Sequence, residues 1–246
     1  MTRSVSDPDF KYTPSNNIYW KKLMHLPSEL QGLAYADQNT ETHRGDWRSN
    51  FPATRTKTPN SKPMLHVEVG CNAGHVCLEW AKQNADELYI GIDWKFKQIY
   101  RLAEKAGDAQ VKNLLAFRAN AERLPLMFAP GEIDYLHMFF PDPWPKKAQM
   151  KNRTASEAWL LRIAPLLSGR GYFHLKTDHA DYFEFIRENL EKLKDTYEII
   201  EETRNLHADN PKAHLLTIPA VTLFERLFIK DGLPIHSVKV RCKLIS

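Results

Sequence analysis

From Pro63 onward, apolar residues gather into short runs that alternate with longer stretches of mixed polarity. Five of these runs are typical of strands: "MLHVEV", "LYIGID", "NLLAFR", "IDYLHMFF" and "GYFHLK". The stretches between and after them favour helices: "HVCLEWAKQN", "FKQIYRLAEKAG", "TASEAWLLRIAPLL" and "ADYFEFIRENLEKL". Strands that alternate with helices predict a parallel sheet with helices on both faces.

The C-terminal part departs from this rhythm. "TLFERLFIKDGLPIHSVKVRCKLI" contains two β-like runs around Asp231–Gly232, so it predicts a hairpin. In the second run, apolar residues alternate with Ser237, Lys239, Arg241 and Lys243. One face of that strand is expected to be buried and the other positively charged. We therefore expect an α/β fold with a mostly parallel, seven-stranded sheet that ends in a C-terminal antiparallel hairpin.

The first part of the chain is rich in Asn, Thr, Ser, Pro and charged residues and has only short apolar clusters. We expect residues 1–60 to form a partly ordered N-terminal extension and residues 61–246 to form the main domain. The hydrophobic fraction of 43% and the charged fraction of 26% are ordinary for a globular protein. A formal net charge of +4 permits a polyanionic partner without requiring one.

Cysteine and histidine usage bears on compartment and metal binding. Cys71, Cys77 and Cys242 are odd in number and lack the paired spacing of a zinc site, which favours reduced thiols in a cytoplasmic protein. The ten histidines show no metal-ligand spacing either. No apolar run approaches the roughly 20 residues that span a membrane, and the polar N-terminus is unlike a signal peptide. We expect a soluble, cytoplasmic protein without a membrane or metal partner.

The segment "VEVGCNAGH" lies where the first predicted strand gives way to a helix. Gly70 and Gly74 would let the backbone come close to a ligand, and the helix N-terminus offers free amide hydrogens. Asn72 stands between them, and Asn is the residue other than Gly that best tolerates a positive φ, so the turn is expected to survive. Taken alone, the segment is equally compatible with a plain strand-to-helix turn.

Two polar residues end the next predicted strands. Asp93 ends the second strand, where an acid accepts hydrogen bonds from the ribose hydroxyls in nucleoside-binding sheets. Asn120 ends the third strand, where a side-chain amide could meet adenine. The alternatives are that Asp93 caps the next helix and Asn120 a turn. Glu68, just before Gly70, would repel a phosphate but suits a cationic ligand. S-adenosylmethionine carries an ammonium and a sulfonium, so this set favours S-adenosylmethionine as the cofactor of a methyl transfer.

"MFFPDPWPKK" places three prolines within five positions, which ends any strand or helix there. The prolines would hold Asp142 and Trp144 on a stiff loop. In isolation, Asp142 would more commonly cap a turn and Trp144 would fill the core. Beside the cofactor-like set, we favour a functional pair of a carboxylate and a stacking surface.

In this order and at these separations, "VEVGCNAGH", "GID", "RANAE", "FFPDPWPKK", "KTD" and "TLFER" resemble the motifs of the tRNA (guanine-N(7)-)-methyltransferases. The resemblance extends from about Arg44 to Val240. It implies a Rossmann-like class I methyltransferase fold, S-adenosylmethionine as cofactor and tRNA as partner, with 7-methylguanosine formed at the variable-loop guanine. Two departures stand out: Asn72 replaces the family's middle glycine, and "KKAQMKNR" is less basic than the family's run.

The resemblance also implies roles for individual residues. The cofactor pocket would be lined by Glu68, Gly70, Gly74, Asp93 and Asn120, with Asp142 at its edge as the catalytic residue that faces the guanine. The RNA substrate would be contacted by Lys146, Asp178, Thr222 and Glu225. Phosphates would meet the basic residues of the "KKAQMKNR" run (Lys146, Lys147, Lys151 and Arg153) and the charged face of the last strand.

Three more of these roles have structural alternatives. Asp178 would cap the following helix as readily as it would bind the amino edge of guanine. In isolation, Thr222 would more commonly begin a strand and Glu225 would form a surface pair with Arg226.

The chemistry of guanine N7 explains why a carboxylate is useful. N7 is a lone pair without a proton, so its methylation needs alignment and exclusion of water rather than a general base. Asp142 could accept hydrogen bonds from the guanine and favour the cationic ring that forms. Two alternatives stay open: a methyltransferase-like RNA-binding protein without turnover, and an enzyme of the same sheet type acting on another substrate such as an amine. The protein would be a monomer or a homodimer.

Overall fold

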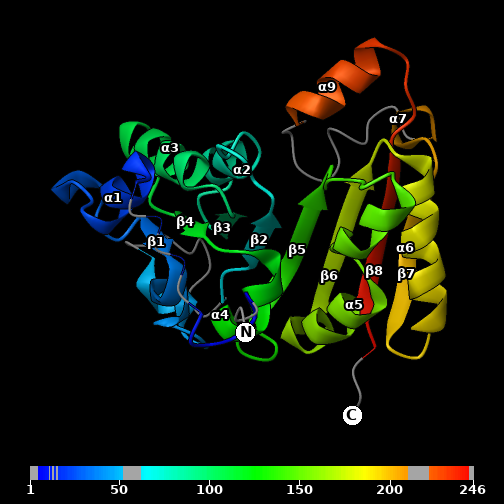
Figure 1. The fold of residues 1–246 in the computed structure, drawn as a ribbon, viewed down its shortest axis with the longest axis horizontal. Helices are drawn as coiled ribbons and strands as arrows, with labels where there is room; N and C mark the ends of the chain where they lie inside the picture. The colour runs from blue at the N-terminus through cyan, green and yellow to red at the C-terminus, as the bar shows by residue number, and fades with distance from the viewer. Residues whose placement is uncertain are drawn as a thin grey trace.

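The computed structural model describes residues 5–10, 12, 14, 16–51, 62–209 and 222–243. These residues form one eight-stranded sheet with the order β1-β4-β3-β2-β5-β6-β8-β7 (Figure 1). The strands are β1 (Ala34–Ala36), β2 (Leu65–Val69), β3 (Leu88–Asp93), β4 (Leu114–Arg118), β5 (Ile133–Phe139), β6 (Leu167–Thr177), β7 (Tyr197–Thr203) and β8 (His236–Cys242). Strands β1 to β6 pair in parallel, and β8 is antiparallel to both β6 and β7.

Helices cover both faces of this sheet (Figure 1). The α-helices are α1 (Ile18–Met24), α2 (Cys77–Gln83), α3 (Phe96–Asp108), α4 (Leu124–Met127), α5 (Glu157–Ile163), α6 (Ala180–Lys192), α7 (Leu206–Asp209) and α9 (Leu223–Lys230). The 3-10 helices are η1 (Ser28–Leu30), η2 (Asp37–Glu41), η3 (Trp47–Asn50), η4 (Ala121–Arg123), η5 (Lys147–Asn152) and η6 (Ala164–Leu166). Among the helices of the described ranges, none is both long and apolar enough to cross a bilayer.

Two buried clusters lie on opposite faces of the sheet. In β3, Ile90 belongs to the cluster that also contains residues of α5 and α6. The preceding residue, Tyr89, faces the other side of the sheet and packs with α2 and α3. This alternation follows from the two-residue period of a strand. Because both faces are covered, strands β2, β3 and β4 are buried along almost their whole length rather than on one face only, as expected of a parallel sheet.

The expected α/β fold with a mostly parallel sheet and a C-terminal antiparallel pair is confirmed, but the strand count of seven is wrong by one. The extra strand, β1, comes from the expected N-terminal extension and pairs in parallel with β4. Trp47 of the same segment is fully buried, and its indole N–H donates to the carbonyl of Met127 at 2.8 Å. The boundary expected between residues 60 and 61 lies outside the described ranges.

The expected hairpin around Asp231–Gly232 is wrong, because its first arm is the helix α9. Thr222 caps this helix, accepting a hydrogen bond from the Glu225 N–H at 2.9 Å. Gly232, with a φ of 66°, follows the helix end and donates its N–H to the carbonyl of Ile229 at 3.2 Å. The glycine therefore ends a helix, and the antiparallel partner of β8 on its outer side is β7, a strand that the apolar pattern did not predict.

The positively charged face expected on β8 is wrong in its first half. Ser237 and Lys239 are buried, and the Lys239 ammonium donates to the Glu201 carboxylate of β7 at 2.7 Å. Only Arg241 and Lys243 of the expected set are exposed, and Leu244 lies outside the described residues. One of the three positive charges, that of Lys239, is therefore used within the sheet, where it pairs with a glutamate of β7.

Candidate functional site

The glycine loop that follows β2 has an unusual backbone. Gly70, Asn72 and Gly74 all have a positive φ, of 80°, 53° and 71°. The expectation that Asn72 keeps the turn is therefore confirmed. A Cβ at Gly74 would lie 2.1 Å from Cδ1 of Leu102 in α3, so this position has no room for a side chain. The loop thus comes close to both its own helix and α3.

Glu68 lies beneath this loop and is 5% exposed. Its carboxylate accepts a hydrogen bond from the Cys77 N–H, in the first turn of α2, at 3.1 Å. Burial raises the pKa of Glu68 to about 7, although the hydrogen bonds from Cys77 lower it, and the charge of Asp93 raises it further. A cationic ligand beside a buried carboxyl group with a pKa near neutral would stabilise the ionised form of that group.

Asp93 ties the glycine loop to the end of β3. One carboxylate oxygen accepts from the Asn72 N–H at 3.1 Å, and the other accepts from the Lys95 N–H at 2.8 Å. The N-cap residue of α3 is Lys95, so Asp93 is not the helix cap considered as an alternative. Burial raises the pKa of Asp93, the two backbone hydrogen bonds lower it, and the charge of Asp142 raises it. The carboxyl groups of Asp93 and Asp142 therefore lie near enough to interact.

Asn120 ends the segment after β4 and caps the short helix η4. Its side-chain oxygen accepts from the Glu122 N–H at 2.9 Å, which is the turn-capping alternative. The side chain is exposed. Its capping bond uses one lone pair of the oxygen, so its amide group keeps the capacity to meet a ligand.

The "FFPDPWP" corner follows β5, and its loop has positive φ values of 51° at Phe140 and 45° at Trp144. Arg153 holds the loop, donating from its Nε to the carbonyl of Pro143 at 2.8 Å. Its guanidinium lies 5.3 Å from the ring centroid of Tyr182, and it is buried. The expectation that Arg153 meets phosphates is therefore wrong, because this residue positions the loop. Asp142 is exposed, and Trp144 is half-buried.

The sheet register brings the glycine loop and the corner together. Val69, the last residue of β2, pairs with Met138 of β5. The two loops therefore start from adjacent strand ends, at the carboxyl edge where ligands bind in sheets of this kind. This placement agrees with the electrostatic interaction between Asp93 and Asp142.

Helix α9 lies beyond the end of β6 (Figure 1). A buried ion pair anchors it there. Lys176 donates to both carboxylate oxygens of Glu225, at 3.1 and 3.2 Å, and His207 Nε2 lies 2.9 Å from one of them. Glu225 is 0% exposed, so the surface pair with Arg226 considered as an alternative is wrong. The sequence signal for this pair is the lysine that ends the strand-like run "GYFHLK".

Asp178 is exposed just after β6. The N-cap of α6 is His179, whose side chain accepts from the Tyr182 N–H at 3.3 Å. The capping alternative for Asp178 is therefore wrong, and its carboxylate is available at the same edge of the sheet. Lys146, Lys147 and Lys151 are exposed as well.

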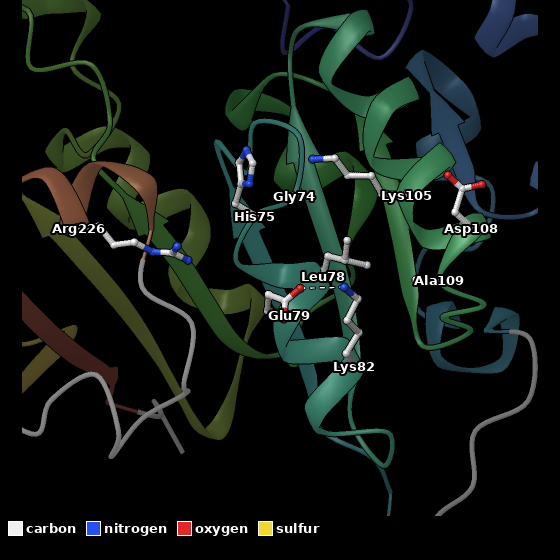
Figure 2. Close-up of a pocket in the computed structure, with 9 residues that line it drawn as sticks. All are labelled: Gly74, His75, Leu78, Glu79, Lys82, Lys105, Asp108, Ala109 and Arg226. Carbon is white, nitrogen blue, oxygen red and sulfur yellow. Dashed lines mark hydrogen bonds and ion pairs between the residues drawn. The ribbon is translucent and has the colours of Figure 1, made fainter.

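An open pocket of about 560 Å³ lies beside the glycine loop, between α2, α3 and α9 (Figure 2). Of the residues that line it, the sequence singled out Gly74 as a ligand-binding residue. The pKa of His75 in this pocket is lowered by burial and by the charges of Lys105 and Arg226. Across the described parts of the chain, no group of three or more His, Cys, Asp and Glu residues is arranged to hold a metal ion.

Solved structures resemble this fold at low sequence identity. A crystal structure of the 16S rRNA methyltransferase KamB superposes with a TM-score of 0.54 at 16% identity, over 74% of this chain and 88% of that one. A structure of an antibiotic-related methyltransferase gives a TM-score of 0.53 at 19% identity, over 76% and 98%. These similarities concern the fold, which is the expected Rossmann-like class I methyltransferase fold.

Sequence comparisons identify the family. A family model with the description "Putative methyltransferase" matches residues 62–238. The tRNA (guanine-N(7)-)-methyltransferase of Bdellovibrio bacteriovorus is 29% identical, over 89% of this chain and 99% of its own. Proteins of the same name from Lachnoclostridium phytofermentans and Bacillus cytotoxicus are 30% and 34% identical, over 87% and 67% of this chain and 95% and 74% of their own. The chain therefore belongs to the tRNA (guanine-N(7)-)-methyltransferase family.

Proposed function

We propose that this protein transfers a methyl group from S-adenosylmethionine to N7 of a guanine in the variable loop of tRNA. One observation carries the proposal: the pairing of Val69 with Met138 brings the glycine loop and the Asp142 corner to adjacent strand ends. A cofactor site and a base-holding carboxylate would then share one crevice. The names of the relatives supply the substrate class.

The residues around the glycine loop fit S-adenosylmethionine. The buried carboxyl of Glu68 would gain a counter-charge from the ligand's cationic part. Gly70 and Gly74 would let the backbone come close, Asp93 would accept from the ribose hydroxyls, and Asn120 would meet the adenine. When bound, S-adenosylmethionine supplies an electrophilic methyl group on its sulfonium.

Asp142 would hold the guanine in line with that methyl group. Its carboxylate would accept hydrogen bonds from guanine N1–H and the amino group, and its charge would stabilise the cationic ring. Trp144 would stack on the extruded base. The hydrogen bond from Arg153 to the carbonyl of Pro143 would hold both side chains in place before the substrate binds, so that no ordering of the loop is needed during the reaction.

The other expected RNA contacts differ in exposure. Lys146 and Asp178 are exposed and would meet a phosphate and the guanine edge respectively. Thr222 and Glu225 are bonded within the protein, so a contact from them to the RNA would require those bonds to be exchanged. The reaction would take place in the cytoplasm, by a monomer or a homodimer.

The direct test is incubation with methyl-labelled S-adenosylmethionine and an unmodified tRNA transcript, followed by nucleoside analysis. We expect label in 7-methylguanosine, and none when the variable-loop guanine is replaced by adenine. Undiminished incorporation into the adenine transcript would reject the guanine assignment. Binding of tRNA without turnover, and without measurable affinity for millimolar S-adenosylmethionine, would favour the RNA-binding alternative.

A Glu68→Gln variant is expected to bind S-adenosylmethionine about ten- to a hundredfold more weakly, since a charge-assisted hydrogen bond contributes roughly 1.5–3 kcal/mol. Calorimetry at pH 6, 7 and 8 should give a wild-type affinity that rises with pH, because Glu68 ionises near pH 7. The variant's affinity should be flat over this range. A flat wild-type profile would remove Glu68 from the cofactor site.

The same variant offers a second readout that does not depend on the cofactor. The pKa of Glu68 is higher in the folded protein than the ordinary value of 4.5. The folded state therefore binds the proton more tightly than the unfolded state, and this group lowers stability as pH rises from about 4.5 to 7. Thermal unfolding at pH 8 should show Glu68→Gln to be more stable than the wild type, by at most roughly 3 kcal/mol.

A further inference from the structure

The pocket between α2, α3 and α9 brings together basic side chains from α3, from α9 and from the glycine loop. In Figure 2, the side chains of Arg226 and Lys105 extend into the pocket from opposite sides, with His75 between them near Gly74. Leu78 lies on the wall between them. This end of the pocket is next to the glycine loop and therefore close to the proposed cofactor site.

Two acids, Glu79 and Asp108, also line this pocket, but within the described ranges neither forms an ion pair with Lys105 or Arg226. The Lys105 ammonium donates to the backbone carbonyl of Ala73 at 3.0 Å, a contact that fixes its place but leaves its charge. Glu79, the acid on α2, is 2.8 Å from Lys82 and forms an ion pair with it. Within the described ranges, no salt bridge or hydrogen bond to the Arg226 side chain is observed.

The pKa of His75 reflects its burial and the two positive charges beside it. Its pKa is lowered by burial first, and then by the charges of Lys105 and Arg226. An imidazole responds in this way to cations close by. The charges of Lys105 and Arg226 both disfavour protonation of His75, and an anion placed among the three side chains would offset this repulsion.

The position of Arg226 is set by buried contacts of the residues around it. Its neighbour Glu225 is held by Lys176 and His207. On the same helix, the ring of Phe228 lies 5.6 Å from that of Phe140, which belongs to the "FFPDPWP" corner. These contacts hold α9 against the rest of the protein, and Arg226 therefore extends into the pocket from a helix whose position is set by its packing.

We infer that this pocket binds a phosphate group of the tRNA backbone through Arg226, Lys105 and His75. Arg offers a fork of N–H donors to two phosphate oxygens, and Lys adds a point charge. The pocket is open to solvent, as a phosphate on a continuous RNA chain requires. The inference rests on the proposed function and adds a backbone contact beside the glycine loop.

Arg226→Ala and Lys105→Ala test the inference through the salt dependence of tRNA binding. Each lost phosphate contact should lower tRNA affinity about tenfold at low salt and flatten the slope of log affinity against log salt by about one. Lys112→Ala is the matched control, since it removes one exposed positive charge outside the pocket. Affinity for S-adenosylmethionine, measured by calorimetry, should stay at the wild-type value in all three.

Inorganic phosphate provides a probe that is independent of tRNA. In the wild type, titration with phosphate should shift the ring signals of His75 in NMR spectra to saturation and raise its pKa. Both effects should be absent in the Arg226→Ala, Lys105→Ala double variant. Their persistence in the double variant would contradict the assignment.

The outcomes separate this inference from the proposed function. If the wild type methylates tRNA and both pocket variants keep the wild-type slope, the pocket assignment alone is wrong. If the variants lose affinity for S-adenosylmethionine and keep the slope, the pocket serves the cofactor, and the assignment is again wrong. If the wild type neither binds nor methylates tRNA, the proposed function fails together with the inference.

Discussion

An Asp142→Ala variant is expected to lose turnover by about a hundred- to a thousandfold while it keeps wild-type affinity for S-adenosylmethionine. The magnitude is that of removing one preorganised group aimed at charge that develops in the transition state. Asp142 is exposed, and its loop is held by Arg153 through the carbonyl of Pro143. The substitution should therefore leave the free energy of unfolding within about 0.5 kcal/mol of the wild type.

Single-turnover methylation of a tRNA transcript and calorimetry with S-adenosylmethionine measure the two effects separately. Asp195→Ala, which removes another exposed carboxylate, should behave as the wild type in both. Asp142→Asn keeps an acceptor without its charge and should lie between the wild type and Asp142→Ala. An equal loss of turnover and cofactor affinity would place Asp142 in the cofactor site.

Glu225→Ala is expected to lower the free energy of unfolding by about 3–5 kcal/mol, the usual cost of leaving one partner of a buried ion pair uncompensated. Lys176 lies on β6 between β5 and β8 and is itself buried, so its charge cannot reach water without disrupting the sheet edge. Denaturant unfolding measures the loss. Glu188→Ala, an exposed carboxylate on α6, should change stability by no more than about 0.5 kcal/mol.

The double variant Lys176→Met, Glu225→Leu completes the test. An apolar pair of similar volume should recover most of the lost stability, because the desolvation of two charges is no longer required. If Glu225→Ala matches the exposed control in stability but loses affinity for tRNA or cofactor, the ion pair is not structural. The substrate contact implied by the family resemblance would then be the better account of Glu225.

Much of the site could be predicted from local sequence because its chemistry is local. A strand followed by "GCNAG" requires positive φ at three positions, and Gly, Asn and Gly supply it. The prolines of "PDPWP" required a loop there, whatever the rest of the chain did. Parallel strands place their carboxyl ends on one edge, so the expectation that these segments meet followed from the alternation of strands and helices.

Helix α9 and strand β7 could not be predicted this way. "TLFERLFIK" is a short apolar run whose period fits a helix as well as a strand, and the neighbouring Asp231–Gly232 resembles a hairpin turn. "YEIIEET" carries glutamates along an edge strand, so its apolar alternation is weak. What decided both was the pairing of β8 between β6 and β7, a contact between segments far apart in the chain.

The amino-acid sequence by itself determined the class of fold, the shape of the glycine loop and the end of β5 at the Asp142 corner, because each follows from backbone rules that act over a few residues. Only the tertiary structure decided which charges remain free. Arg153, Lys239 and Glu225 all read as surface charges, yet each is buried against a partner from another part of the chain. Burial and pairing depend on distant residues, and an ionic group meets its partner only when the sheet brings the two together.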